Sequence, residues 1–245
     1  DQLHDWLKTA GVAREGQALG IGFSHHGADL RASLPTTGLT AENRLLLDKL
    51  RERPCFLMVG TVEPRKGHRQ ALSAMERLWA AGADVNLVMI GKQGWMMETF
   101  AETVRQSPEY GRRLFWPQAI SDEVLEHVYR GSRALLAASY GEGFGLPLIE
   151  AAHYGLPIIA RDLPVFREVA GEHAFYFQGE TPEGLAAALQ DWLSRKKVPE
   201  SAGVARLTWN ESATRLLKLA VNGEWDFEWP ERPSPTLLGE SALKR

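Results

Sequence analysis

The stretch ALLAASYGEGFGLPLIEAAHYGLPIIA, residues 134–160, carries two apolar runs with a glycine-rich turn and a helical segment between them. Gly143 and Gly145 stand in the turn, and Pro147 stands where a helix would begin, a position that proline favours. A buried strand, a turn, a helix and a second buried strand make one parallel β-α-β unit. The stretch therefore predicts a parallel sheet with helices packed on it.

The same alternation continues on both sides of this unit. Apolar runs typical of buried strands are CFLMVGT (55–61), VNLVMIG (85–91), RLFWPQ (113–118), LPIIAR (156–161) and AFYFQ (174–178). Helical patterns occupy residues 41–54, 68–82, 98–107, 121–132, 162–171 and 181–197. Strands that are apolar on both faces and alternate with helices form a sheet covered on both sides. We therefore expect an α/β fold with a doubly wound, Rossmann-like parallel sheet.

The two ends of the chain have other patterns. Residues 1–11 have the apolar spacing of a helix, and residues 18–23 read as a short strand. Near the other end, residues 210–221 predict a helix, and the Pro-rich, aromatic and acidic segment that follows predicts an extended tail. Because the chain opens at Asp1 without an initiator methionine, we expect a fragment of a longer protein.

The composition is that of a globular protein. Of 245 residues, 44% are hydrophobic and 24% are charged, and the formal net charge of −3 gives no basic field that would argue for nucleic acid. No apolar run approaches the roughly 20 residues of a membrane-spanning helix. The single cysteine, Cys55, excludes a disulfide within the chain and fits a reducing compartment. The histidines lack the spacing of metal ligands, so we expect no metal site.

Three turns follow expected strands and should lie together, because doubly wound sheets bind ligands beyond the carboxyl ends of their strands. They are GTVEPRKGH (60–68), IGKQGW (90–95) and SYGEGFGLP (139–147). The first supplies Arg65 and Lys66, which can neutralise a diphosphate. The third leads into a helix N-terminus, which attracts anions, and brings Glu142 and Glu150, whose carboxylates can accept hydrogen bonds from vicinal hydroxyls. The turns predict a phosphorylated, hydroxyl-rich ligand.

Together, these motifs resemble those of one enzyme family. GTVEPRKG, SYGEGFGLPLIEAAHYGLPIIA and LPVFREVAG are similar to segments of the retaining GT-B glycosyltransferases with an E-x7-E motif, known as glycosyl transferases group 1 or family 4. The resemblance implies two Rossmann-like domains facing across a cleft, of which this chain holds the C-terminal, nucleotide-sugar-binding one. Residues 1–30 would be the end of the N-terminal domain and the linker, 31–205 the Rossmann-like domain, and 206–245 the C-terminal helix and tail.

The resemblance also implies a role for each matching residue. Glu142 and Lys66 would be catalytic, since Glu142 would face the donor sugar and Lys66 would stabilise the leaving diphosphate. Glu150 would hold the ribose hydroxyls. The implied donor-binding set is Gly60, Thr61, Arg65, Lys66, Gly143, Phe144, Gly145, Leu146 and Glu150. Thr61 departs from the family pattern, because many members have arginine there, and Arg65 is the residue that could take over that contact.

The implied activity is transfer of a hexose from a GDP- or UDP-linked sugar, with mannose weakly favoured by the PRK form of the first turn. No cofactor and no metal would be needed. The acceptor would be a glycan or glycolipid, bound through the N-terminal domain, in surface polysaccharide or lipopolysaccharide synthesis. We expect a cytoplasmic protein, with peripheral association at the inner membrane as an alternative, and a chain that binds donor but transfers it poorly by itself.

Other functions fit the sequence less well. A dinucleotide-dependent dehydrogenase would need G-x-G-x-x-G after its first strand, and CFLMVGTVEPRKG does not supply it. An epimerase of the UDP-N-acetylglucosamine type shares the architecture but lacks EGFGLP followed by Glu-Ala. A non-catalytic module that binds a nucleotide sugar or a partner stays open as the alternative.

Three further features near the turns receive expectations of their own. His68 is expected to be structural or solvated rather than a metal ligand. Residues 95–97 (WMM) are expected to pack at the start of a helix rather than to form an apolar lip over the cleft. Arg161 occupies a place where the family commonly has serine or threonine.

Overall fold

The computed structural model describes residues 2–10, 18–28 and 36–229. The chain divides into two compact units, one formed by residues 28–206 and the other by residues 1–27 together with 207–245. The division into 1–30, 31–205 and 206–245 that the sequence suggests stays a prediction.

The larger unit is built on a six-stranded parallel sheet in the order β4-β3-β2-β5-β6-β7. The strands are β2 (Cys55–Val59), β3 (Asn86–Ile90), β4 (Leu114–Phe115), β5 (Ala134–Ala137), β6 (Ile158–Arg161) and β7 (Phe175–Phe177). In the register of the central strands, Leu57 of β2 lies beside Val88 of β3 on one side and Leu135 of β5 on the other. The predicted doubly wound parallel sheet is confirmed.

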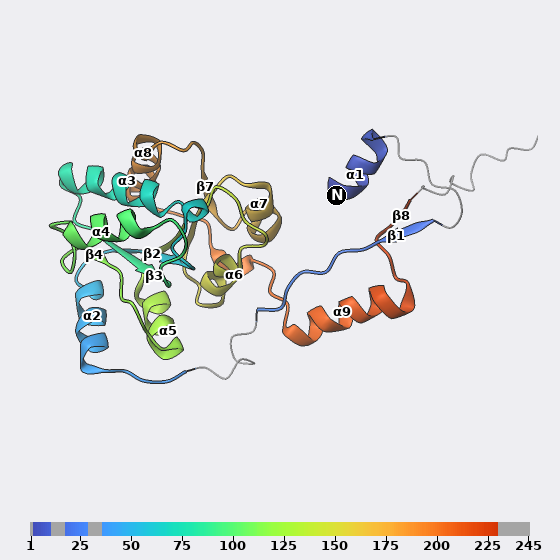
Figure 1. Ribbon diagram of the computed structural model, residues 1–245, viewed down its shortest axis with the longest axis horizontal. Helices are drawn as coiled ribbons and strands as arrows, with labels where there is room; N and C mark the ends of the chain where they lie inside the picture. The colour runs from blue at the N-terminus through green and yellow to red at the C-terminus, as the bar shows by residue number, and fades with distance from the viewer. Residues whose placement is uncertain (1, 11–17, 29–35, 230–245) are drawn as a thin grey trace, which may run out of the picture. The chain divides into compact units, whose positions relative to one another are not determined.

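Helices cover both faces of this sheet, as Figure 1 shows. One layer contains α3 (His68–Ala80), α4 (Glu98–Gln106) and α8 (Pro182–Ser194), and the other contains α2 (Ala41–Arg51), α5 (Asp122–Gly131), α6 (Leu146–His153) and α7 (Pro164–Ala170). Side chains alternate along each strand, so Phe56 and Leu87 pack into the first core while Leu57 and Val88 pack into the second. This two-sided burial is why the strands read as continuous apolar runs.

The strand order reverses beside β2, and this reversal places the candidate site. From β2 the chain builds outward through β3 to the edge strand β4, and then β5 returns to the other side of β2. In a doubly wound sheet, the crevice at such a switch point is where ligands bind. Two segments leave the sheet there: residues 60–67, which contain the short 3-10 helix η1 (Pro64–Lys66), and residues 138–145, which lead into α6.

The smaller unit contains α1 (Gln2–Thr9), α9 (Trp209–Asn222) and a two-stranded antiparallel sheet of β1 (Leu19–Ile21) and β8 (Phe227–Trp229). Thr208 and Glu211 form a capping box that begins α9, and a second 3-10 helix, η2 (Ser201–Gly203), closes the larger unit. The expected C-terminal tail includes β8, and its residues 230–245 lie outside the described part of the chain. Among the helices of the described residues, none is both long and apolar enough to cross a membrane.

Candidate functional site

The turns after β2 and β5 are held against each other at the switch point. The backbone N–H of Tyr140 donates to the carbonyl oxygen of Arg65 at 2.7 Å. Gly67 has a φ of 73°, and a Cβ at this position would collide with the carbonyl oxygen of Ala138. Glycine at position 67 is therefore what allows the first turn to lie against the end of β5.

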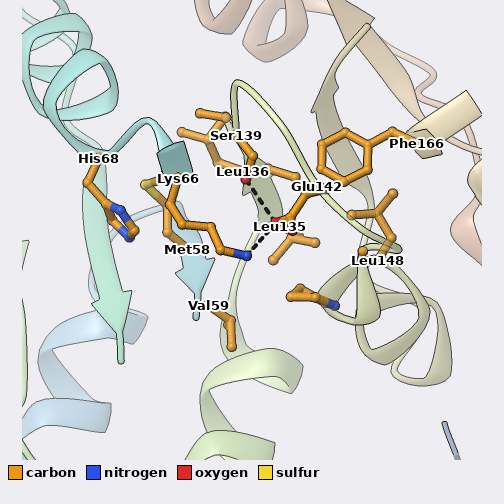
Figure 2. Close-up of a pocket in the computed structure, with 14 residues that line it drawn as sticks. Met58, Val59, Lys66, His68, Leu135, Leu136, Ser139, Glu142, Leu148 and Phe166 are labelled. Carbon is orange, nitrogen blue, oxygen red and sulfur yellow. Dashed lines mark hydrogen bonds and ion pairs between the residues drawn. The ribbon is translucent and has the colours of Figure 1, made fainter. Parts of the chain in front are cut away.

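A cluster of charged side chains joins the two turns. The Glu142 carboxylate accepts a hydrogen bond from the Lys66 ammonium on Oε1, and the Arg65 Nη1 donates to Oε2 at 2.9 Å. The Ser139 hydroxyl also donates to Oε1, at 3.0 Å. Figure 2 shows Lys66 and Ser139 directed at the same carboxylate from opposite turns. Two residues predicted as phosphate-binding cations are thus already bound to the first glutamate of the motif.

The Glu142 side chain is only 9% exposed, and its environment acts on its pKa in two directions. Burial raises the pKa of the carboxyl, because a charge is poorly solvated inside a protein. The hydrogen bonds and charges of Lys66 and Arg65, with the hydrogen bond from Ser139, outweigh this, so the pKa of Glu142 lies below its ordinary value. The group is therefore an anion at neutral pH.

A second carboxylate balances the cluster. Glu63 Oε1 lies 2.7 Å from Arg65 Nη2, and its other oxygen accepts a hydrogen bond from the Trp95 indole at 3.2 Å. Lys66 and Arg65 are therefore matched by Glu142 and Glu63, and the four side chains carry no net formal charge.

The turn after β3 packs on the turn after β2 and carries Trp95. The N–H of Val62 donates to the carbonyl of Lys92 at 2.8 Å, and the N–H of Gly94 donates back to the carbonyl of Val62 at 2.9 Å. Met97 is fully buried at the start of α4, as expected, whereas Trp95 and Met96 are 59% and 66% exposed. Helix-start packing therefore accounts for Met97, and the neighbouring Trp95 and Met96 project from the turn.

The start of α6 lies next to the charged cluster. Gly145 has a φ of 98°, and a Cβ there would lie 3.0 Å from the Phe166 ring, so the turn into the helix favours glycine. Phe144 is half-buried against the core, while Gly143 and Leu146 are exposed. In the first turn of α6, Pro147 has no N–H and the Leu148 N–H donates to the Gly145 carbonyl at 2.9 Å, so the exposed Leu146 is the residue whose N–H can face an anion at the switch point.

Glu150 lies one turn further along α6 and points into the protein. Its Oε2 accepts a hydrogen bond from the Tyr129 hydroxyl of α5 at 2.5 Å. Burial raises the pKa of Glu150, the Tyr129 hydrogen bond partly offsets that effect, and the Asp122 charge adds to it. Tyr129 is absent from the predicted site, and the signal for it was weak: one tyrosine on the buried face of an amphipathic helix.

A small cavity lies under the Lys66–Glu142 pair. Its volume is about 20 Å³, enough for one water molecule, and Leu148 and Phe166 line its apolar side. His68, 2% exposed, forms part of the wall (Figure 2), and its Nδ1 has no hydrogen-bond partner among the described residues. Burial, with the nearby Lys66 charge, lowers the pKa of His68 to about 3, so the ring is neutral.

Arg161 supports the same turn from behind. It is 5% exposed, and its guanidinium donates to the carbonyl oxygens of Ala138 and Ser139, both at 2.9 Å. It also binds the Gly179 carbonyl and the side chain of Gln70. The buried Arg161 guanidinium, at the position where the family commonly has serine or threonine, therefore fixes the backbone just after β5 through hydrogen bonds, an arrangement that we call the Arg161 clamp.

Comparison with known proteins decides the family. Residues 43–206 match the family described as glycosyl transferases group 1. The chain belongs to this family. The serotype-specific mannosyltransferase WbdA of Escherichia coli is 52% identical over 197 residues, which cover 79% of this chain and 24% of that protein. The O-antigen chain mannosyltransferase B of Escherichia coli is 28% identical over 172 residues, covering 66% of this chain and 44% of that protein. The chain thus spans about a quarter of the length of WbdA.

Solved structures agree on the fold. The C-terminal domain of the glycosyl transferase group 1 protein LpcC from Francisella tularensis superimposes with a TM-score of 0.53 at 21% identity, covering 72% of this chain and 94% of that one. Sucrose-phosphate synthase from Thermosynechococcus elongatus gives a TM-score of 0.59 at 24% identity, covering 89% and 52%. The predicted family, and the C-terminal half of the GT-B architecture as its fold, are confirmed.

The structure of this group 1 family member brings most of the predicted residues to one place. Those on the turn after β2 are Gly60, Thr61, Arg65 and Lys66, and those on the turn after β5 are Glu142, Gly143, Phe144, Gly145 and Leu146. Glu150 lies deeper in α6, where α5 meets it. Among the residues that the structure describes, no three His, Cys, Asp or Glu side chains form a group that could hold a metal ion. The family uses nucleotide-sugar donors, which makes this place the candidate donor site.

Proposed function

We propose that residues 28–206 bind the donor of a retaining mannosyltransferase that builds a surface polysaccharide of the O-antigen type. The observation that carries this proposal is the pair of cations, Arg65 and Lys66, that meet Glu142, the first motif glutamate, across the β2–β5 switch point. The choice of mannose and of an O-antigen-type product is supported by the relatives, which are named as mannosyltransferases and include an O-antigen chain enzyme. GDP-mannose is the donor that we favour.

In this proposal the donor lies across the mouth of the sheet. Its diphosphate would meet Lys66, Arg65 and the first turn of α6, its ribose hydroxyls would bind Glu150, and its sugar would face Glu142. Lys66 is well placed for the diphosphate, because it comes from the turn that Gly67 presses against β5. Two cations can neutralise the phosphates without a metal ion, and we propose that none is required.

The chemical task of the site is electrostatic. When the bond between the anomeric carbon and the diphosphate oxygen breaks, negative charge develops on the leaving group. The acceptor hydroxyl oxygen forms the new bond on the same face of the sugar, and its proton passes to the leaving diphosphate oxygen. Fixed cations close to the leaving oxygen stabilise that charge more in the transition state than in the bound donor. Lys66 would supply this stabilisation, with Arg65 beside it.

Calorimetric titration of the chain with GDP, UDP and ADP, with and without magnesium, tests the proposal. We expect GDP to bind most tightly, with no dependence on magnesium, and we expect Glu150→Ala to lose most of that affinity. The control is Glu102→Ala, an exposed acid on α4 away from the site, which should bind GDP as the unmodified chain does. If none of the three nucleotides binds, the donor-site proposal is wrong.

A further inference from the structure

Tyr129 and Glu150 form an isolated polar contact within an apolar layer. Tyr129 is 1% exposed, and its hydroxyl donates to the Glu150 carboxylate at 2.5 Å. A buried tyrosine hydroxyl without a partner destabilises the fold, because its hydrogen bonds to water are lost, so the layer accommodates this oxygen only together with an acceptor. Glu150 is the acceptor, and the contact ties α5 to α6.

The Tyr129 ring is fixed by its neighbours. It stacks on Tyr154 with ring centres 5.2 Å apart and an angle of 24° between the planes. The Arg130 guanidinium lies 5.0 Å from the centre of the Tyr154 ring and covers the stack. The Tyr129 hydroxyl therefore has little freedom to move, and it specifies where one oxygen of Glu150 must lie.

Holding one oxygen leaves the other available. A carboxylate has two oxygens and about four acceptor positions, and the structure uses Oε2 for Tyr129. Asp122, at the start of α5, is the nearby like charge, and Thr36 holds it through its N–H and hydroxyl, each at 2.8 Å. Glu150 is thus held by Tyr129 of α5 through Oε2, and Oε1 is the oxygen that remains for a ligand.

We propose that Tyr129 is a positioning residue for ribose recognition: its hydroxyl holds the Glu150 carboxylate in the orientation that accepts the 2′- and 3′-hydroxyls of a nucleoside diphosphate. This rests on the proposed donor site. Without the Tyr129 hydroxyl, Glu150 keeps its place on α6 but loses its fixed direction, together with the hydrogen bond that partly offsets the rise in its pKa. Hydrogen bonds that depend on direction then weaken.

The test compares GDP with 2′,3′-dideoxy-GDP on the whole chain, by calorimetry, for the unmodified protein and for Tyr129→Phe. The unmodified chain should bind GDP about tenfold more tightly than the dideoxy compound, the ratio expected for hydrogen bonds to a charged group. In Tyr129→Phe this ratio should fall toward one, because GDP binding weakens while dideoxy-GDP binding stays constant. A purely structural role would weaken both ligands by the same factor and leave the ratio unchanged.

Two further variants sharpen the result. In Glu150→Ala the GDP affinity should equal the dideoxy-GDP affinity. Adding Tyr129→Phe to Glu150→Ala should not weaken GDP binding further, since the tyrosine acts only through the glutamate. Tyr176→Phe is the matched control: it removes a hydroxyl that binds the backbone carbonyls of Phe166 and Gly171, and it should keep the full ratio.

The outcomes separate the two proposals. A chain that binds GDP, with a Tyr129→Phe variant that keeps the full ratio, overturns the positioning role and leaves the donor site standing. A chain that does not bind GDP contradicts both.

Discussion

Arg65 and Glu142 lie 2.9 Å apart across the switch point between β2 and β5, so a cation expected to bind phosphate is already paired with a glutamate. Lys66 shares the same carboxylate. A diphosphate that takes these cations must therefore compete with Glu142, and part of its interaction energy is used to displace or rearrange that pair.

Glu142→Gln should therefore bind GDP more tightly than the unmodified chain does. Removing the negative charge frees Lys66 for the phosphates and leaves Arg65 paired with Glu63 alone, and we expect a gain in affinity of roughly threefold or more. Calorimetric titration measures it. Glu172→Gln, a change at an exposed acid after α7, is the control and should leave the affinity as it is. A Glu142→Gln chain that binds GDP more weakly would show that Glu142 contacts the nucleotide rather than competing with it.

Gly67→Ala should destabilise the fold strongly. The new Cβ would need an unfavourable backbone angle and would also strike the Ala138 carbonyl, so we expect a loss of about 3 kcal/mol or more in the free energy of unfolding. Gly82→Ala is a matched control, because Gly82 has a φ of 90° but open space around its Cβ, and it should cost only about 1 kcal/mol. Urea unfolding gives both values, and equal losses would mean that the contact with β5 is not tight.

Arg161→Lys should show that the guanidinium fork matters and not the charge alone. Lysine has three N–H donors on a single nitrogen, so it cannot hold all four acceptors of the arginine fork, which are the carbonyls of Ala138, Ser139 and Gly179 and the side chain of Gln70. We expect the free energy of unfolding to fall by about 2 kcal/mol, measured by urea unfolding. Arg195→Lys, at an exposed arginine that pairs with Asp191 on the surface of α8, should have no measurable effect. An Arg161→Lys chain as stable as the unmodified one would contradict the clamp.

His68 should make the protein less stable in mild acid. Its pKa is lowered to about 3 in the folded state, against about 6.5 in the unfolded chain, so between these values the unfolded state binds a proton that the folded state does not. The free energy of unfolding therefore falls as the pH drops from about 6.5 toward 3, by at most about 1.4 kcal/mol per pH unit.

The control for this pH effect is a pair of variants. His68→Phe should flatten the pH dependence between pH 6.5 and 5, whereas His153→Gln, at an exposed position, should keep it. Urea unfolding across this range would contradict the assignment if the slope with pH survived in His68→Phe.

The sequence was a good guide to the fold and to the backbone of the site, for physical reasons that can be named. Strands such as Cys55–Val59 bury both faces and so read as unbroken apolar runs, and the glycines at 67 and 145 mark turns that side chains would obstruct. Lys66 follows β2 and Glu142 follows β5, and the carboxyl ends of parallel strands lie at the same edge of the sheet, so the sequence also predicts that these two residues lie there.

The contacts between side chains were harder to foresee. Tyr129 meets Glu150 because α5 and α6 share one layer, and Arg161 reaches Ser139 because β6 lies beside β5. A single polar residue in an apolar pattern gives no indication of its partner, since the partner is fixed only when the elements pack. The neutralisation of Arg65 by Glu63 and Glu142 depends on side-chain geometry in the same way.

The balanced cluster of Lys66, Arg65, Glu63 and Glu142 also governs how quickly a nucleotide arrives. Long-range attraction speeds the encounter of an anion with a site only where the site has net positive charge, and here the four charges cancel in a chain whose formal net charge is −3. Association should therefore proceed by unassisted diffusion, with a rate constant that salt does not lower. The donor is then selected by short-range contacts in the site, where its phosphates replace the carboxylates as partners of Arg65 and Lys66.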